Sequence, residues 1–121
     1  MLLAEDEHVT RRILERHLTR FGFEVISVMD GLHAWDVLES PDAPRIVLLD
    51  WNMPGLDGVD ICRRLRAREK TNYTYTLLMT ASDRKGDVVQ GLHAGADDFI
   101  SKPVDPPELG ARLNRSEERR V

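Results

Sequence analysis

The chain alternates five times between a short apolar run and a longer segment with helical periodicity. The short runs are rich in leucine and β-branched residues and are bounded by turn residues, which is typical of buried strands. Strands that alternate with helices favour an α/β fold, a parallel sheet with helices on both faces. At 121 residues the chain is long enough for one domain with a substantial core. The expected strands are Met1–Ala4, Glu24–Val28, Ile46–Asp50, Thr74–Thr80 and Asp98–Ser101.

Apolar residues spaced three and four positions apart place a helix after each strand. The first helix runs up to Phe21, and Gly22 should end it as a C-cap. Glu7 is expected to be an acidic residue at the start of this helix. Pro106 opens the fifth helix, because proline is well suited to the first helical turn.

Charge and composition exclude several classes of protein. The formal net charge of −4 offers no basic surface for nucleic acid or an anionic membrane. Cys62 is the only cysteine, so no internal disulfide can form, as expected in a reducing compartment. No apolar run approaches the roughly 20 residues of a membrane span, and the acids Glu5 and Asp6 do not fit a signal peptide. We therefore expect a cytoplasmic protein whose domain binds neither nucleic acid nor membrane.

Acidic residues stand where the first and third expected strands end. Glu5 and Asp6 follow the first strand, and Asp50 ends the third. Ligands of open α/β sheets bind in the crevice beyond these carboxyl ends. Three carboxylates at close range repel one another, and a divalent cation removes that repulsion. An oxygen-only ligand set favours Mg²⁺ over zinc, and Mn²⁺ could take its place.

The same edge holds groups suited to phosphoryl transfer. Thr80 ends the fourth strand and Lys102 follows the fifth, so a hydroxyl and an ammonium group are available for phosphate oxygens. An aspartate in such a setting can act as a nucleophile and form an aspartyl-phosphate. The residues therefore predict that Asp50 attacks while Thr80 and Lys102 stabilise the transferred group.

With these residues in this order, the chain resembles the receiver domain of bacterial two-component response regulators, from Leu2 to about Leu113. The resemblance is carried by Glu5-Asp6, Asp50 in LLDWNMPGLDG, Thr80-Ala81 in LLMTA, Phe99, and Lys102-Pro103. It implies a flavodoxin-like (βα)5 fold with strand order 2-1-3-4-5, and a receiver domain at residues 1–113. It also implies Mg²⁺-dependent transfer of a phosphoryl group to Asp50 from the phosphohistidine of a sensor histidine kinase or phosphotransfer protein. Slow self-hydrolysis would follow, so the chain would be a signalling phosphoacceptor and not a turnover enzyme.

The resemblance further assigns roles to the residues after Asp50 and Thr80. It makes the backbone carbonyl of Asn52 a metal ligand, and the backbone amides of Trp51 and Ala81 phosphoryl-binding groups. Asn52 also stands at one of the two positions that tune phosphate lifetime in this family, and Ser82 stands at the other.

Phosphorylation is expected to change the shape of the domain through a coupled pair. The resemblance implies that the hydroxyl of Thr80 moves toward the phosphate while the ring of Phe99 turns inward. The face built from the fourth helix, the fifth strand and the fifth helix would report this change. Partners would then be an output domain in cis or a separate protein, and a homodimer could form on phosphorylation.

Two features depart from the commonest pattern of the family. The acidic pair is Glu5-Asp6 and not two aspartates, which makes Asp6 the expected direct metal ligand. Trp51 is a bulky residue beside the nucleophile and could shield the site. The resemblance also implies a cis peptide bond between Lys102 and Pro103.

An alternative from another class is a phosphatase like the haloacid dehalogenases, which also uses an aspartate nucleophile, Mg²⁺, threonine and lysine. That family places its nucleophile on the first strand and its acidic pair late, whereas here the acidic pair comes first. Nucleotide binding is less favoured, because no glycine-rich loop follows the first strand.

Residues 114–121 have almost no apolar stripe and are expected to be a helix end or the start of a linker to an output domain. They resemble linkers that lead into diguanylate cyclases, although a stand-alone receiver or one attached to a sensor kinase stays open. Of the other residues, Cys62 is expected to fill the core, and His8 is the histidine next to the acids. The arginines of the third helix, Arg63, Arg64, Arg66 and Arg68, are expected to form a solvated face, with a partner-binding patch as the alternative.

Overall fold

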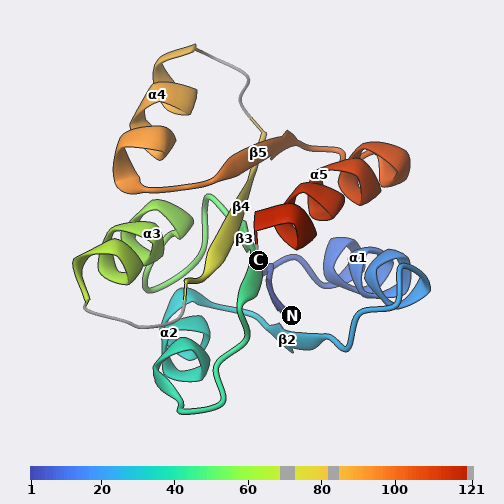
Figure 1. The fold of residues 1–121 in the computed structure, drawn as a ribbon, viewed down its shortest axis with the longest axis horizontal. Coiled ribbons are helices and arrows are strands. Elements are labelled where there is room, and N and C mark those ends of the chain that lie inside the picture. The colour runs from blue at the N-terminus through green and yellow to red at the C-terminus, as the bar shows by residue number, and fades with distance from the viewer. Residues whose placement is uncertain (69–72, 82–84, 120–121) are drawn as a thin grey trace.

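The structure is a computed structural model that describes residues 1–68, 73–81 and 85–119. It contains a five-stranded parallel sheet in the order β2-β1-β3-β4-β5 (Figure 1). The predicted α/β fold and strand order are confirmed. The elements in chain order are β1 Leu2–Ala4, α1 His8–Arg20, β2 Ile26–Val28, α2 Gly31–Glu39, β3 Ile46–Asp50, α3 Gly58–Ala67, β4 Tyr75–Thr80, α4 Lys85–Ala94, β5 Asp98–Ser101 and α5 Pro106–Arg119.

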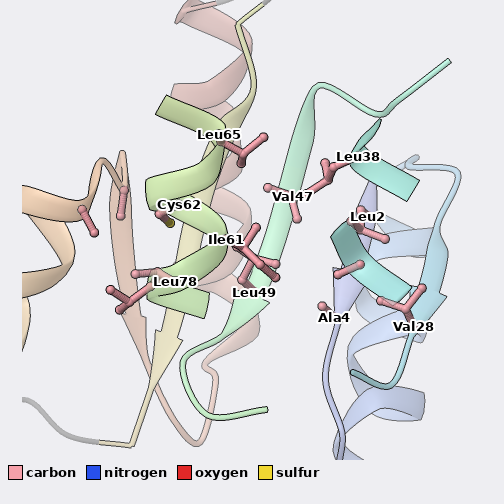
Figure 2. Close-up of a cluster of buried hydrophobic side chains, with 14 residues drawn as sticks. Leu2, Ala4, Val28, Leu38, Val47, Leu49, Ile61, Cys62, Leu65 and Leu78 are labelled. Atoms are coloured by element: carbon pink, nitrogen blue, oxygen red, sulfur yellow. The ribbon is translucent and has the colours of Figure 1, made fainter. Parts of the chain in front are cut away.

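The core has two layers, one on each face of the sheet. Successive side chains of a strand point to opposite faces, so Val47 and Leu49 of β3 enter one layer while Ile46 and Leu48 enter the other. Helices α2, α3 and α4 supply the first layer, and α1 and α5 supply the second. Figure 2 shows the first layer, with side chains of α3 packed over β3 and β4. Each fully buried leucine contributes roughly 1.5–3 kcal/mol, so these layers hold the strand ends in place.

The helices begin and end at the residues that the sequence marks. Glu7 is the N-cap of α1, and its carboxylate accepts hydrogen bonds from the amides of Val9 and Thr10. After α1, Gly22 has a φ of 95°, a conformation that favours glycine. Pro106 is the first residue of α5, as expected. The starts of α1 and α5 therefore set where the loops after β1 and β5 end.

Strand β2 is shorter than predicted, because it starts at Ile26 and not at Glu24. It is an edge strand that pairs only with β1, and the register aligns Ile26 with Leu2. The pairing begins where the Ile26 amide donates to the carbonyl of Met1 at 2.9 Å. The Met1 ammonium group donates a hydrogen bond to the carbonyl of Glu24.

The expectation of a solvated arginine face on α3 holds for Arg63 and Arg64, which are exposed, and is wrong for the other two. Arg66 is half-buried and donates to the carbonyls of Gly95 (2.9 Å) and Thr74 (3.0 Å). Arg68 donates to the carbonyl of Leu38 at 3.0 Å and lies over the Trp35 ring. These contacts were missed because they depend on which loops lie beside α3, and helical periodicity carries no such information.

Two further expectations concern the chain as a whole. None of the described helices combines the length and apolarity needed to cross a membrane. Residues 114–119 continue α5, while residues 120 and 121 lie outside the described part of the chain.

Candidate functional site

Three carboxylates meet beyond the carboxyl ends of β1 and β3, as the sequence predicted. Glu5 and Asp6 follow β1 directly, and Asp50 is the last residue of β3. Each offers a carboxylate oxygen within 4.8 Å of the other two. Glu5 and Asp50 are buried, whereas Asp6 is exposed. The cluster is therefore open to solvent on the side of Asp6.

Lys102 binds the two buried carboxylates. Its Nζ lies 2.6 Å from Glu5 Oε1 and 3.0 Å from Asp50 Oδ2. Burial alone would lower the pKa of Lys102, but the hydrogen bonds and charges of Glu5 and Asp50 outweigh it, so the pKa is raised. Lys102 is therefore a cation held against the nucleophile candidate.

Glu5 is the most confined of the three acids. Its side chain is completely buried, and this burial, together with the nearby Asp50, raises its pKa despite the opposing effect of Lys102. The Glu7 amide donates to Glu5 Oε2 at 3.2 Å. Glu5 Oε1 has the ammonium group of Lys102 beside it but no partner in hydrogen-bond geometry. The Lys102 ammonium group, 2.6 Å away, is therefore the cation that offsets the charge of this buried oxygen.

The donor set fits a hard divalent cation. All three candidate ligands are carboxylate oxygens, and among the described residues this is the only group of three or more acidic, histidine or cysteine side chains with metal-binding spacing. Mg²⁺ is bound in proteins by one or two carboxylates together with water and phosphate oxygens. Lys102 supplies one positive charge against three carboxylates, so a cation would reduce the remaining repulsion.

The loop after Asp50 begins with a close contact between backbones. The Gly58 amide donates to the carbonyl of Trp51 at 2.9 Å. A β-carbon at Gly58 would lie 2.6 Å from the Asp50 carbonyl oxygen, so only glycine allows α3 to start this close to Asp50. The loop thus folds back over the end of β3, and Asn52 lies exposed within it.

The Trp51 amide, expected to bind the phosphoryl group, donates to the carbonyl of Met79 at 2.9 Å. In this structure that donor belongs to the ladder between β3 and β4. The Trp51 side chain is half-buried and packs against the core layer beneath α3. The roles expected of Trp51 and Asn52 stay predictions.

The fourth and fifth strands place the remaining expected residues at the same edge. Thr80 is buried at the end of β4, and its carbonyl accepts a hydrogen bond from the Lys102 amide at 2.9 Å. Ala81 follows it and is exposed. Ser82 lies outside the described residues. Phe99 of β5 is half-buried and packs against the layer that α4 covers.

Other expectations near the site have clear outcomes. The peptide bond between Lys102 and Pro103 is cis, as the resemblance implied. Cys62 is buried in the core, as expected. His8 Nδ1 lies 3.0 Å from a guanidinium nitrogen of Arg11, a residue that our sequence reasoning did not select.

Arg11 could have been found from its position on α1. It shares the buried stripe of the helix with Leu14 and Leu18, three and seven positions further on. A charged residue on an apolar stripe is unusual and requires a partner. Here the partner is the backbone carbonyl of Glu5, at 2.9 Å from Arg11 Nη1.

Comparison with known proteins agrees with this geometry. The family model of the response regulator receiver domain matches residues 1–114. The response regulator PleD of Caulobacter vibrioides is 42% identical over 113 residues, which cover 93% of this chain and 25% of PleD. The chain therefore spans only part of the length of such relatives. Neither match supports a phosphatase of the haloacid dehalogenase type.

Solved structures with the same fold include receivers from two kinds of protein. One is a probable two-component system response regulator/GGDEF domain protein, with a TM-score of 0.88, 30% identity, and coverage of 98% of this chain and 48% of that one. Another is the receiver domain of a sensor histidine kinase of Pseudomonas aeruginosa, with a magnesium ion coordinated in its active site cleft. Its TM-score is 0.81 at 32% identity, and the match covers 94% of this chain and 93% of that one.

Proposed function

The chain belongs to the response regulator receiver family, a family of signalling domains, and we propose that it accepts a phosphoryl group on Asp50. The observation that carries this proposal is the contact of Lys102 with Asp50 at 3.0 Å, inside a cluster of three carboxylates. A buried nucleophile candidate, a fixed cation and a metal-type donor set lie within one edge of the sheet.

In the proposed reaction, a carboxylate oxygen of Asp50 attacks the phosphorus atom of a phosphohistidine on a sensor kinase or phosphotransfer protein. A new P–O bond forms as the P–N bond breaks, and its electron pair stays on the imidazole nitrogen of the donor. Lys102 neutralises charge on the transferred group, and the Thr80 hydroxyl donates to one of its oxygens. Hydrolysis reverses the modification when water attacks phosphorus and the P–O bond to Asp50 breaks, which releases inorganic phosphate.

The acidic residues would hold Mg²⁺, or Mn²⁺ in its place. Asp6 and Asp50 are the proposed direct ligands together with the Asn52 carbonyl, and Glu5 supports them from its buried position. A bound Mg²⁺ would supply positive charge that offsets the carboxylates and the phosphoryl oxygens.

The backbone amides of Trp51 and Ala81, the two proposed phosphoryl-binding amides, differ in their present hydrogen bonds. Ala81 is an exposed residue that directly follows Thr80, and we assign its amide the first such contact. The Trp51 amide would first have to release the Met79 carbonyl. Asn52 and Ser82 are proposed to tune phosphate lifetime.

The signal would reach the face of α4, β5 and α5 through Thr80 and Phe99. Phosphorylation adds roughly one further negative charge to Asp50, which attracts the Thr80 hydroxyl. Its movement opens space that the Phe99 ring can fill, and the new arrangement biases a two-state element.

The output controlled by this receiver is proposed from its relatives. PleD is named a response regulator, and one structural neighbour is titled a response regulator/GGDEF domain protein. We propose that residues 1–113 are the receiver unit and that residues 114–121 lead toward an output domain such as a diguanylate cyclase. Dimerisation on phosphorylation would be one way for the face of α4, β5 and α5 to control it.

Phosphorylation by a small donor tests the proposed function. The protein is incubated with acetyl phosphate and Mg²⁺ and examined by intact-protein mass spectrometry. We expect one phosphoryl adduct that Asp50→Asn abolishes and that Asp36→Asn, an exposed change on α2, preserves. An unmodified wild-type protein would contradict the proposal, as would an adduct retained in Asp50→Asn.

A further inference from the structure

Arg11 is a buried cation that lies beside the acidic site without pairing with it. Arg11 is only 8% exposed, yet among the described residues its guanidinium forms no ion pair with a carboxylate. Its guanidinium instead donates to the Glu5 backbone carbonyl at 2.9 Å and approaches His8 Nδ1 at 3.0 Å. Burial of an arginine is unfavourable unless its donors are hydrogen-bonded. The bond to the Glu5 carbonyl therefore helps to hold Arg11 in its buried position.

The carbonyl that Arg11 binds belongs to the peptide that joins Glu5 to Asp6. A peptide group is planar, so fixing the direction of this carbonyl also fixes the Asp6 amide and the Asp6 Cα, which limits where the Asp6 side chain can lie. The Asp6 carboxylate is exposed, and within the described part of the chain no hydrogen bond or ion pair holds it. Its approach to within 4.8 Å of Glu5 and Asp50 is therefore set by the backbone.

Other contacts at this turn act on neighbouring groups and not on that peptide carbonyl. Lys102 and the Glu7 amide both bind the Glu5 side chain. The Arg11 amide donates to the Glu7 carbonyl at 2.9 Å, which anchors Arg11 in the first turn of α1. Arg11 thus spans the turn, with its backbone bonded at the helix start and its guanidinium bonded at the strand end.

We propose that Arg11 is a positioning residue that aims Asp6 into the metal site. The role rests on the proposed function, because it concerns the Mg²⁺ site of the receiver. Without the guanidinium, the peptide between Glu5 and Asp6 can rotate, and the Asp6 carboxylate is no longer held toward Glu5 and Asp50. Groups that orient metal ligands in this indirect way typically change metal affinity by about 10- to 100-fold when removed.

A pair of substitutions separates the hydrogen bond from the bulk of the side chain. Arg11→Met keeps a long side chain without a donor, while Arg11→Lys keeps one donor. We expect Arg11→Met to raise the Kd for Mg²⁺ about 10-fold by calorimetric titration with MgCl₂, and Arg11→Lys to recover part of the loss. Arg12→Met is the matched control, because Arg12 is the exposed neighbour whose ion pair with Glu15 measures 4.0 Å.

A double-mutant cycle tests whether Arg11 acts through Asp6. In an Asp6→Asn background, Arg11→Met should no longer weaken Mg²⁺ binding, because the ligand that it positions is gone. Urea unfolding without Mg²⁺ measures the stability of each variant separately. A merely structural role would lower that stability and leave the Kd of the folded protein unchanged.

Several outcomes would overturn the proposal. Equal Mg²⁺ affinity in wild type and Arg11→Met would remove the positioning role alone, as would full additivity with Asp6→Asn. A wild-type protein that binds no Mg²⁺ would remove both this role and the metal site of the proposed function. If Arg11→Met does not fold, Arg11→Leu, which also lacks a donor, takes its place, and a Kd equal to that of wild type would again overturn the role.

Discussion

Gly91 of α4 faces the ring of Phe99 on β5 so closely that a β-carbon on Gly91 would lie 2.4 Å from Phe99 Cζ. The missing side chain therefore makes the space that the ring occupies. Leu78 of β4 closes the same space, with Cδ1 3.3 Å from that position. The proposed switch residue is thus held between a helix and the sheet, in a place that one added methyl group would fill.

Gly91→Ala is expected to push the Phe99 ring out of this position. Alanine is favoured over glycine in a helix by about 1 kcal/mol, and this gain offsets part of the steric cost. The free energy of unfolding should therefore change little, while the aromatic NMR signals of Phe99 shift. In a Phe99→Leu background the same substitution should stabilise the protein, because the clash with the ring is gone. Unshifted Phe99 signals in Gly91→Ala would contradict the packing described above.

Mg²⁺ should raise the thermal stability of the protein, because it binds the folded carboxylate cluster and not the unfolded chain. At 100 times the Kd the gain is about 2.7 kcal/mol, and excess chelator should reverse it. Asp6→Asn should reduce the shift in Tm at a fixed Mg²⁺ concentration. Ca²⁺ and Mn²⁺ titrations, followed in parallel, show whether the site discriminates among hard cations. An unchanged Tm at saturating Mg²⁺ would argue against the metal site.

Fluorescence should report the same binding event through the tryptophan beside Asp50. Trp51 follows the nucleophile candidate directly, whereas Trp35 lies on α2 against Arg64 and Arg68. We expect Mg²⁺ to change the tryptophan emission of wild type and of Trp35→Phe. The emission of Trp51→Phe should not change when Mg²⁺ is added. A signal that survives in Trp51→Phe would place the ion elsewhere.

Arg66→Ala is expected to destabilise the protein far more than Arg63→Ala on the same helix. Arg66 pairs with the buried carboxylate of Asp97 at 2.9 Å and also binds the carbonyl of Gly95 at 2.9 Å. Removing it leaves these acceptors short of a donor, which should cost about 2–4 kcal/mol. Arg63 is exposed and lies 3.9 Å from Asp60, so its loss should cost less than about 1 kcal/mol. Urea unfolding of both variants checks the difference, and equal losses would contradict the buried network.

Cys62 should resist alkylation in the folded protein and make stability fall at high pH. Burial raises the pKa of its thiol from 9.0 to about 11. Between these values the unfolded chain releases a proton that the folded chain retains, so stability is fully present below pH 9 and falls as pH rises toward 11. The loss amounts to roughly 1.4 kcal/mol per pH unit in that window. Cys62→Ala should remove this pH dependence, so urea unfolding should show a loss of stability relative to wild type that is constant below pH 9 and shrinks toward pH 11.

Much of the fold was predictable because its signals are local. The β-branched and leucine run that ends in Asp50 identifies a buried strand in any context, and Pro106 marks the first turn of a helix. Strand ends on one parallel sheet share an edge, so the meeting of Asp50 with Glu5 and Asp6 also followed from the sequence.

The contacts that hold those residues at their distances were not predictable in the same way. Helical periodicity places Arg66 on α3, but its bonds to Thr74 and Gly95 depend on two loops that the packing of α3 beside α4 brings together. The hydrogen bond from the Trp51 amide to the Met79 carbonyl depends on the register between β3 and β4.

The sequence by itself determined the order of strands and helices along the chain, and the chemical groups available at the sheet edge. Both follow from residue type and spacing along the chain, which act over a few residues. Only the tertiary structure decided that Lys102 contacts both Glu5 and Asp50, that Arg11 donates to the Glu5 carbonyl, and that Phe99 fits against Gly91. The reason is physical: such contacts depend on distances between elements far apart in sequence, and these distances are set by how the two core layers pack.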